Sequence, residues 1–146
     1  MKEYYAPMHT TEHILNQTMV RMFQCNRSFS NHIERKKSKC DYRFGRDLTE
    51  TEKEEIMVIV NETIIQNLEV REELMAVDAA KNQFNLERLP EDAGSEIRIV
   101  KVGNYDACPC IGDHVKNTSE IEGQFKIISS SFENDVLRLR FKLVKN

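Results

Sequence analysis

Three of the four histidines in this 146-residue chain fall in two short segments that share one spacing. His9 and His13 lie four residues apart near the start of a predicted helix, so their imidazoles face the same side, one turn apart. Cys110 and His114 repeat the four-residue spacing late in the chain. Imidazole nitrogen and thiolate sulfur are ligands that suit tetrahedral zinc. The two pairs together predict a zinc site formed by His9, His13, Cys110 and His114.

Several residues near the second pair compete for a place at this site. Cys108 is an alternative to Cys110, because the segment Cys-Pro-Cys brings either sulfur close to the same loop. Cys110 is preferred because it matches the four-residue spacing to His114. Asp106 and Asp113 flank the loop, and either can orient a ligand imidazole, although a solvated loop acid is the commoner role.

The metal permits more than one function. The segment HTTEH at positions 9 to 13 matches the H-x-x-E-H pattern of inverted metalloproteases, in which the glutamate, here Glu12, is the general base. Those enzymes normally complete the site with a carboxylate in a much larger chain, which weakens this alternative. Glu12 also suits the positive end of a helix dipole. A non-catalytic zinc module is a further alternative, because four protein ligands can close the tetrahedron.

The elements that must position these residues follow from apolar spacing and turn signals. Apolar residues at helical intervals predict a helix over residues 8–23, and a second helix begins with the capping-box pair Thr49 and Glu52. Between them, residues 27–44 predict two short strands around a basic turn. A strand over residues 68–74, a short helix over 77–84 and a turn-rich segment over 90–95 follow.

The last third of the chain changes to alternating apolar and polar residues, which predicts half-buried strands. Ile97 and Ile99 lie in one of them, and residues 125–127 and 137–143 form two more, the last two joined by a hairpin turn at Asn134-Asp135. Helices early and strands late indicate an α+β fold with helices packed on one face of a mostly antiparallel sheet. The length indicates a single domain over residues 1–146.

Composition narrows the function classes. The chain carries 40% hydrophobic and 31% charged residues, and no apolar run approaches the roughly 20 residues of a membrane span. We therefore expect no membrane partner and a cytoplasmic location, with Cys25 and Cys40 as buried reduced thiols. A net charge of −3 argues against a generic nucleic-acid binder. Two basic clusters still allow local binding, and they consist of Arg35, Lys36, Lys37 and Lys39, and of Arg138, Arg140 and Lys142.

Two motifs in tandem, HTTEHIL at positions 9–15 and CIGDHVKNTSEIEGQFKI at positions 110–127, resemble the editing domain of alanyl-tRNA synthetase. The likeness runs through nearly the whole chain and is greatest to the short, stand-alone alanyl-tRNA editing proteins. It implies the fold of the alanyl- and threonyl-tRNA synthetase editing domains and a zinc-dependent deacylase acting in trans. The implied reaction is hydrolysis of the ester of a mischarged tRNA, carrying serine or glycine in place of alanine.

The resemblance places the zinc ligands on the four residues already named. Where the family commonly has Cys-Gly-Gly-Thr-His, this chain has Ile111 and Asp113 in place of the first glycine and the threonine. The Gly-rich N-terminal module of longer editing proteins does not occur in this sequence, so we expect tRNA recognition either to come from the catalytic domain alone or to be poor. Zinc can either activate a water or hold the amino group of the aminoacyl moiety, and the sequence does not choose between them.

Residues outside the metal cluster complete the predicted site. Ser30 and His32, on the strand after the first helix, are predicted to face the metal loop as catalytic residues, although a lone histidine on a strand is more often a surface residue. Arg35, Lys36 and Lys37 are predicted to bind phosphates around the tRNA acceptor stem. A solvated hairpin turn explains that basic cluster equally well. The sequence does not predict an oligomeric state.

Overall fold

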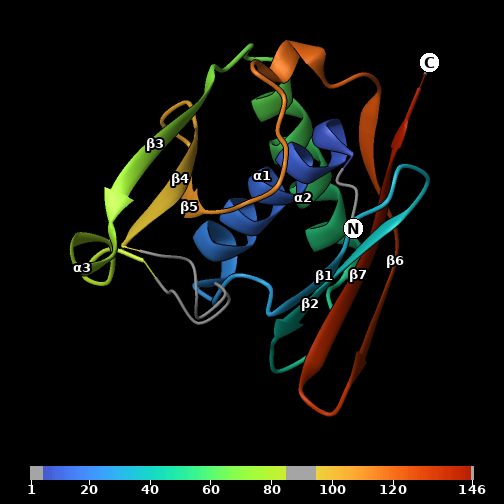
Figure 1. The fold of residues 1–146 in the computed structure, drawn as a ribbon. Coiled ribbons are helices and arrows are strands. Elements are labelled where there is room, and N and C mark those ends of the chain that lie inside the picture. Colours follow the sequence, from blue (N-terminus) through green and yellow to red (C-terminus); the bar gives the residue numbers. More distant parts are fainter. Residues whose placement is uncertain (1–4, 85–94, 146) are drawn as a thin grey trace.

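Two long helices lie between two antiparallel sheets in the computed structural model, which describes residues 5–84 and 95–145 (Figure 1). The helices are α1 (Ala6–Phe23), α2 (Glu50–Ile64) and the short α3 (Val77–Ala80), with a 3-10 turn η1 (Thr118–Glu120). The four-stranded sheet has the order β1 (Ser30–His32), β2 (Ser38–Arg43), β7 (Val136–Val144) and β6 (Gln124–Glu133). The three-stranded sheet has the order β3 (Val70–Ala76), β4 (Glu96–Val102) and β5 (Asp106–Pro109).

Helix α1 is the central element of the fold. Pro7 occupies its first turn, where the missing N–H costs nothing, and the helix ends at Gln24 in the left-handed conformation with φ 57°. It contacts α2 as well as β4 and β5, so every residue from Met8 to Asn16 is buried. The sequence predicts burial on one side only. Because this half of α1 is enclosed all round, its polar side chains must find their hydrogen-bond partners inside the protein.

The main core lies between the two long helices and the inner face of the four-stranded sheet. Cys40 and Tyr42 of β2, together with Leu139 of β7, are fully buried and pack with α2 residues such as Ile56 and Val60. Each such apolar side chain contributes about 1.5–3 kcal/mol on burial. The alternation predicted for residues 137–143 is confirmed in β7, where Leu137, Leu139 and Phe141 are buried and the side chains between them point to the other face.

The predicted hairpin at Asn134-Asp135 is confirmed. Both residues adopt positive φ, 51° and 61°, between the paired strands β6 and β7. This is the conformation that a two-residue turn needs to match the twist of its strands, and Asn and Asp tolerate it better than most residues.

The α+β class is confirmed, and the structure adds two features to it. The strands divide between two sheets that enclose the helices, and β5 forms where the sequence predicts a loop. With four residues, one of them proline, β5 carries no readable alternation, and it lies at a sheet edge where proline is tolerated. The helix predicted over residues 77–84 is shorter, and the predicted turn at 90–95 lies outside the described residues except for Ser95. Among the helices that the structure describes, none has the length and apolarity to cross a membrane.

The predicted capping box of α2 is present and generates a prediction on acid stability. Thr49 Oγ1 accepts a hydrogen bond from the Glu52 N–H at 3.1 Å, and the Glu52 carboxylate accepts from the Thr49 N–H at 2.9 Å. Hydrogen bonds from Arg46 are the main cause that lowers the pKa of Glu52 from 4.5 to about 2. Because the pKa of Glu52 is lowered in the folded chain, the stabilisation of the fold by its ionised carboxylate is complete above pH 4.5. This stabilisation is lost as the pH falls towards 2.

We therefore expect Glu52→Gln to reduce the free energy of unfolding by about 1 kcal/mol at pH 7 and by clearly less near pH 2. Urea unfolding of both proteins at the two pH values measures the difference. Glu55→Gln, on the exposed side of the same helix, serves as the control and should change little. An equal loss of unfolding free energy in Glu52→Gln at both pH values would contradict a role of the ionised Glu52 carboxylate in stability.

Candidate metal centre

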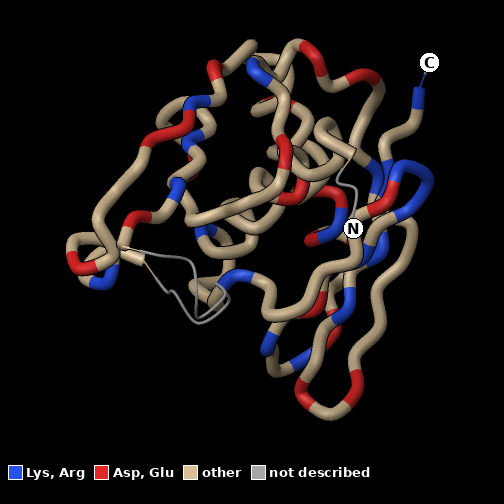
Figure 2. The backbone as a smooth tube through the Cα atoms, in the orientation of Figure 1, with Lys and Arg blue, Asp and Glu red and all other residues tan. Residues whose placement is uncertain are grey.

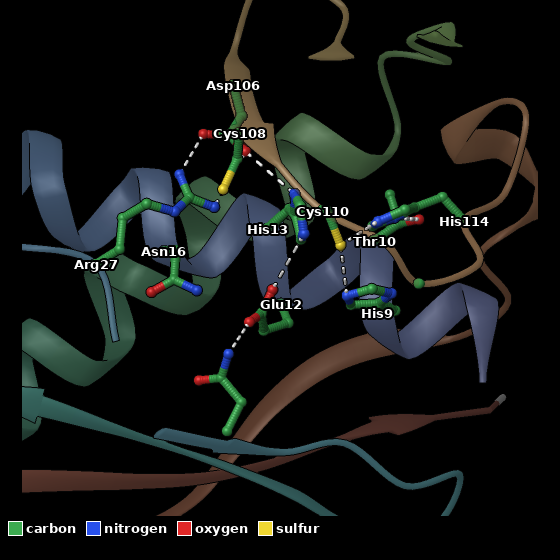
Figure 3. Close-up of polar contacts among 12 residues, drawn as sticks. His9, Thr10, Glu12, His13, Asn16, Arg27, Asp106, Cys108, Cys110 and His114 are labelled. Carbon is green, nitrogen blue, oxygen red and sulfur yellow. Dashed lines mark hydrogen bonds and ion pairs between the residues drawn. The ribbon is translucent and has the colours of Figure 1, made fainter. Parts of the chain in front are cut away.

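Four side chains from two distant segments converge at the N-terminal half of α1 (Figure 3). His9 and His13 come from successive turns of α1, and Cys110 directly follows β5, where its N–H donates to the Arg98 carbonyl at 3.1 Å. His114 lies in the loop between β5 and η1. One donor atom from each of the four lies within 4.8 Å of the others, a grouping that could hold a metal ion.

The sulfur of Cys110 lies close to two of the imidazoles. Its distance to Nε2 of His9 is 3.3 Å and to Nε2 of His114 is 3.5 Å. The rings of His9 and His114 stack with centroids 4.1 Å apart, and the His13 ring meets His114 edge-on at 4.5 Å. Such separations are typical of donor atoms at neighbouring corners of one coordination sphere.

The outer nitrogen of two of these rings is engaged away from the centre. Nδ1–H of His9 donates to the backbone carbonyl of Asp113 at 3.0 Å, and Nδ1 of His114 lies 2.9 Å from Oγ1 of Thr10. The Thr10 hydroxyl is fixed in turn by the Val115 N–H at 3.2 Å. Partners on Nδ1 set the ring orientation and leave Nε2 to face the centre, as in most histidine metal sites.

The third ring is held by a buried carboxylate. Nδ1 of His13 lies 3.5 Å from Oδ2 of Asp106, which also forms a two-pronged ion pair with Arg27 at 2.6 and 3.2 Å. Gln17 donates to the same carboxylate at 2.9 Å. Burial opposes the charge on Asp106, but the contacts with His13 and Arg27 outweigh it and hold the pKa of Asp106 well below its usual range. Asp106 is thus a buried anion that orients His13, and not a solvated loop acid.

The electrostatics favour the protonation states that bind metal. Burial raises the pKa of the Cys110 thiol, but its close contacts with His114, His13 and His9 lower it to about 3. Burial is the main cause that lowers the pKa of His114 to about 4. Burial also lowers the pKa of His13, whereas its contacts with Asp106 and Cys110 raise it well above the usual value. At neutral pH the sulfur is therefore a thiolate and His114 is neutral, while an ion must compete with a proton for His13.

The competing residues near this loop have other roles. Cys108 lies in β5, and its Sγ points to the Pro109 carbonyl at 3.4 Å and is not part of the four-residue grouping. The side chain of Asp113 is exposed, and only its backbone carbonyl serves the site. Cys40 is buried as predicted, whereas Cys25 is only half-buried, and neither forms a disulfide in the described part of the chain.

The structure does not bring Ser30 and His32 to the cluster. Both are exposed on β1, opposite Asp41 and Lys39 of β2, and His32 pairs with Glu34 at 2.8 Å. Side chains alternate along a strand, so the residue between them is the one that faces inward. That residue, Asn31, donates a hydrogen bond to the carboxylate of Glu12.

Sequence reasoning missed the supporting residues of the site. Nothing in the sequence marks Thr10, Arg27 or Asn31, because each acts through a partner that is distant in the chain. Glu12 did carry a signal, since it occupies the fourth position of the H-x-x-E-H pattern. The structure shows it buried beside His13 (Figure 3).

The predicted basic cluster lies on the exposed turn between β1 and β2. Arg35, Lys36 and Lys37 are exposed, and the Arg35 guanidinium stacks over the Tyr5 ring at 4.5 Å. Lys39 of β2 pairs in register with Arg140 of β7. The two basic clusters of the sequence therefore meet where β2 and β7 pair, and Figure 2 marks the lysine and arginine positions of these strands in blue. Arg138 in the same row forms an ion pair with Asp41 of β2.

Comparisons with known proteins show similarity to tRNA synthetases. Residues 97–139, which include Cys110 and His114, match the family described as the threonyl and alanyl tRNA synthetase second additional domain. The chain is similar to alanine–tRNA ligases of Fervidobacterium nodosum (34% identical, 84% of this chain), Halalkalibacterium halodurans (35%, 84%) and Bacillus subtilis (32%, 84%). The matched segment is 14% of the length of each of these relatives.

The buried ion pair generates a prediction on stability. Asp106→Asn removes the charge that balances Arg27 and His13, and we expect a loss of about 3 kcal/mol in the free energy of unfolding. Asp113→Asn is the matched control in the same loop, because its side chain is exposed and its carbonyl is retained. Urea unfolding measures both. Equal stabilities for the two variants would contradict a structural role of the Asp106 carboxylate.

Proposed function

Because the chain is related to the second additional domain of threonyl and alanyl tRNA synthetases, we propose that it hydrolyses the ester bond of mischarged aminoacyl-tRNA. The substrates that we propose are seryl-tRNA and glycyl-tRNA for alanine. The observation that carries the proposal is the four-donor cluster, half of which lies inside the matched segment. We propose that residues 1–146 act as one editing-type domain, in trans on tRNA charged by another protein, in the cytoplasm.

The metal that we propose for the cluster is zinc. A thiolate and neutral imidazoles are the donor set that zinc prefers, and Cys110 and His114 carry the required charges at neutral pH. When bound, zinc would either lower the pKa of a water or hold the amino group of the aminoacyl moiety and so position the ester. The residues of this chain then have distinct tasks: the four donors hold the ion, while Asp106 and Thr10 orient the rings of His13 and His114.

The tRNA contacts that we propose lie on the basic turn. Arg35, Lys36 and Lys37 are exposed on this turn, and Lys39 and Arg140 add positive charge where β2 and β7 pair. Ser30 and His32 lie on that outer face, so we assign them no catalytic role. The buried side of β1 faces α1 instead, and there Asn31 donates a hydrogen bond to Glu12.

The enzymatic proposal predicts a defined pattern of deacylation. We expect purified protein to release serine and glycine from mischarged alanine tRNA and to leave alanyl-tRNA intact. His13→Ala should reduce the rate by about 100-fold or more, because the loss of a metal ligand removes several kcal/mol of transition-state stabilisation. His32→Ala is the matched control, since this histidine is exposed and paired with Glu34.

The same preparation separates the alternatives. Digestion of casein without any loss of aminoacyl ester would favour an inverted metalloprotease. Bound zinc without activity on either substrate would favour a non-catalytic zinc module. Either result would contradict the deacylase proposal.

A separate prediction concerns tRNA binding. Replacing Arg35, Lys36 and Lys37 together with alanine should weaken tRNA binding and reduce the slope of log K against log salt by roughly 0.7–0.9 for each phosphate that the turn no longer neutralises. The control variant replaces Lys53, Lys81 and Lys101 with alanine. It removes the same total charge as the first variant, but these three lysines lie away from the turn and pair with acidic neighbours. Titrations at several salt concentrations measure both. Equal slopes for the two triple variants would exclude a specific role of the turn.

A further inference from the structure

The loop that carries Cys110 and His114, residues 110–114, begins where the regular pairing of the three-stranded sheet ends. The last paired residue of β5 is Pro109, which lies opposite Ile99 of β4 and has no N–H to donate. The next N–H along the chain, that of Cys110, donates to the carbonyl of Arg98 at 3.1 Å. The first ligand of the loop is therefore attached to β4 just beyond the last paired residue of β5.

The side chain of Arg98 contacts the same loop at two further points. Nη1 donates to the carbonyl of Cys110 at 3.3 Å and to the carbonyl of Gly112 at 2.7 Å. Nη2 donates to the carboxylate of Glu72 on the neighbouring strand β3. The hydrogen bond from Arg98 lowers the pKa of Glu72, so this carboxylate is ionised at neutral pH and holds the other end of the guanidinium.

The opposite side of the loop contacts helix α1. The carbonyl of Asp113 accepts the Nδ1–H of His9 at 3.0 Å, and the N–H of Val115 donates to Oγ1 of Thr10 at 3.2 Å. These contacts alternate along the chain with those of Arg98, which holds the carbonyls of residues 110 and 112. The loop is thus fixed between β4 and α1, with Arg98 as its attachment to the sheet.

The arrangement uses the shape of a guanidinium as well as its charge. A planar fork of N–H groups can contact two carbonyls and a carboxylate at once, whereas the ammonium of lysine is a point charge on a flexible stem. The Nε of Arg98 is shielded from solvent and finds no hydrogen-bond partner in the described part of the chain, which is costly. The contacts of Nη1 and Nη2 therefore decide where the guanidinium lies.

From these contacts we propose that Arg98 is a positioning residue of the metal centre, which sets the loop backbone so that the Cys110 sulfur faces the imidazoles before an ion binds. The inference rests on the metal site of the proposed function and deepens it. A loop that is already ordered loses less conformational freedom on binding, so the contacts of Arg98 raise the affinity for the ion. Arg98 needs no contact with the ion for this role.

The experiment compares metal binding by the full chain and its variants, independently of activity. Arg98→Met keeps most of the apolar stem and removes the guanidinium. We expect its zinc affinity, measured by competition with a chelator, to fall by about 10- to 100-fold. With Co²⁺ in place of zinc, we expect the near-ultraviolet charge-transfer band from thiolate to metal to weaken, because that band reports the bond to the Cys110 sulfur.

A conservative variant separates the shape of the side chain from its charge. Arg98→Lys retains the positive charge but cannot contact both carbonyls and Glu72 together. We expect it to lose nearly as much zinc affinity as Arg98→Met and to show the same weakening of the Co²⁺ band. It also decides the question if circular dichroism shows that Arg98→Met does not fold.

The matched control is Lys101→Met. Lys101 lies on the same strand as Arg98 and forms an ion pair at 3.0 Å with Glu73, so this variant also removes a cationic partner of an acid on β3. No contact joins the Lys101 side chain to the loop in the described part of the chain. It should bind zinc like the wild type and leave the Co²⁺ band unchanged, even if urea unfolding shows a small loss of stability.

The outcomes separate this inference from the proposed function. Wild-type zinc affinity and an unchanged Co²⁺ band in either Arg98 variant, with metal binding lost in His13→Ala, would overturn the positioning role and leave the four-ligand site intact. The expected losses in a protein that deacylates no tRNA would support the role of Arg98 and contradict only the proposed reaction. Failure of the wild-type protein to bind zinc would overturn both.

Discussion

The thiolate of Cys110 among three imidazoles is the interaction on which the arrangement of this protein depends. Cys110 and His9 are separated by 101 positions in the chain, yet their donor atoms are 3.3 Å apart. A sulfur anion in a largely buried place is stable only where hydrogen-bond donors or a cation surround it. The edge strand β5 contacts α1 and pairs with β4, so the three-stranded sheet places Cys110 beside the helix.

The same requirement explains the polar interior of α1. A helix enclosed by a second helix and by strands would ordinarily be apolar, whereas here several buried polar side chains lie against specific partners from distant segments. Thr10 contacts His114, Asn16 contacts the segment before β1, and Asp106 contacts His13. Buried polar contacts of this kind add little net stability, but a wrong arrangement leaves charges unpaired. They therefore fix one geometry of the site more than they stabilise the fold.

The four-stranded sheet separates the two chemistries of the molecule. Its inner face carries the apolar core, and its outer face carries the basic residues, including Lys39 and Arg140 in register. The two faces meet at the edge strand β1, where Asn31 points inward to Glu12 and His32 points outward beside Lys39. In the function that we propose, the tRNA backbone contacts the outer face of the sheet. The strand β1 then lies between the phosphate-binding face and the metal cluster.

The sequence by itself determined the features that depend on neighbours along the chain. The capping residues Thr49 and Glu52 fixed the start of α2, the Asn134-Asp135 pair fixed the last hairpin, and the four-residue spacings identified the side chains that converge. Zinc binding by those side chains stays a prediction. Only the tertiary structure decided the second sheet, the strand β5, the burial of Asp106 and the inward direction of Asn31. The physical reason is that strand register and buried polar partners are set by contacts between distant segments, which leave no periodic signal in the sequence.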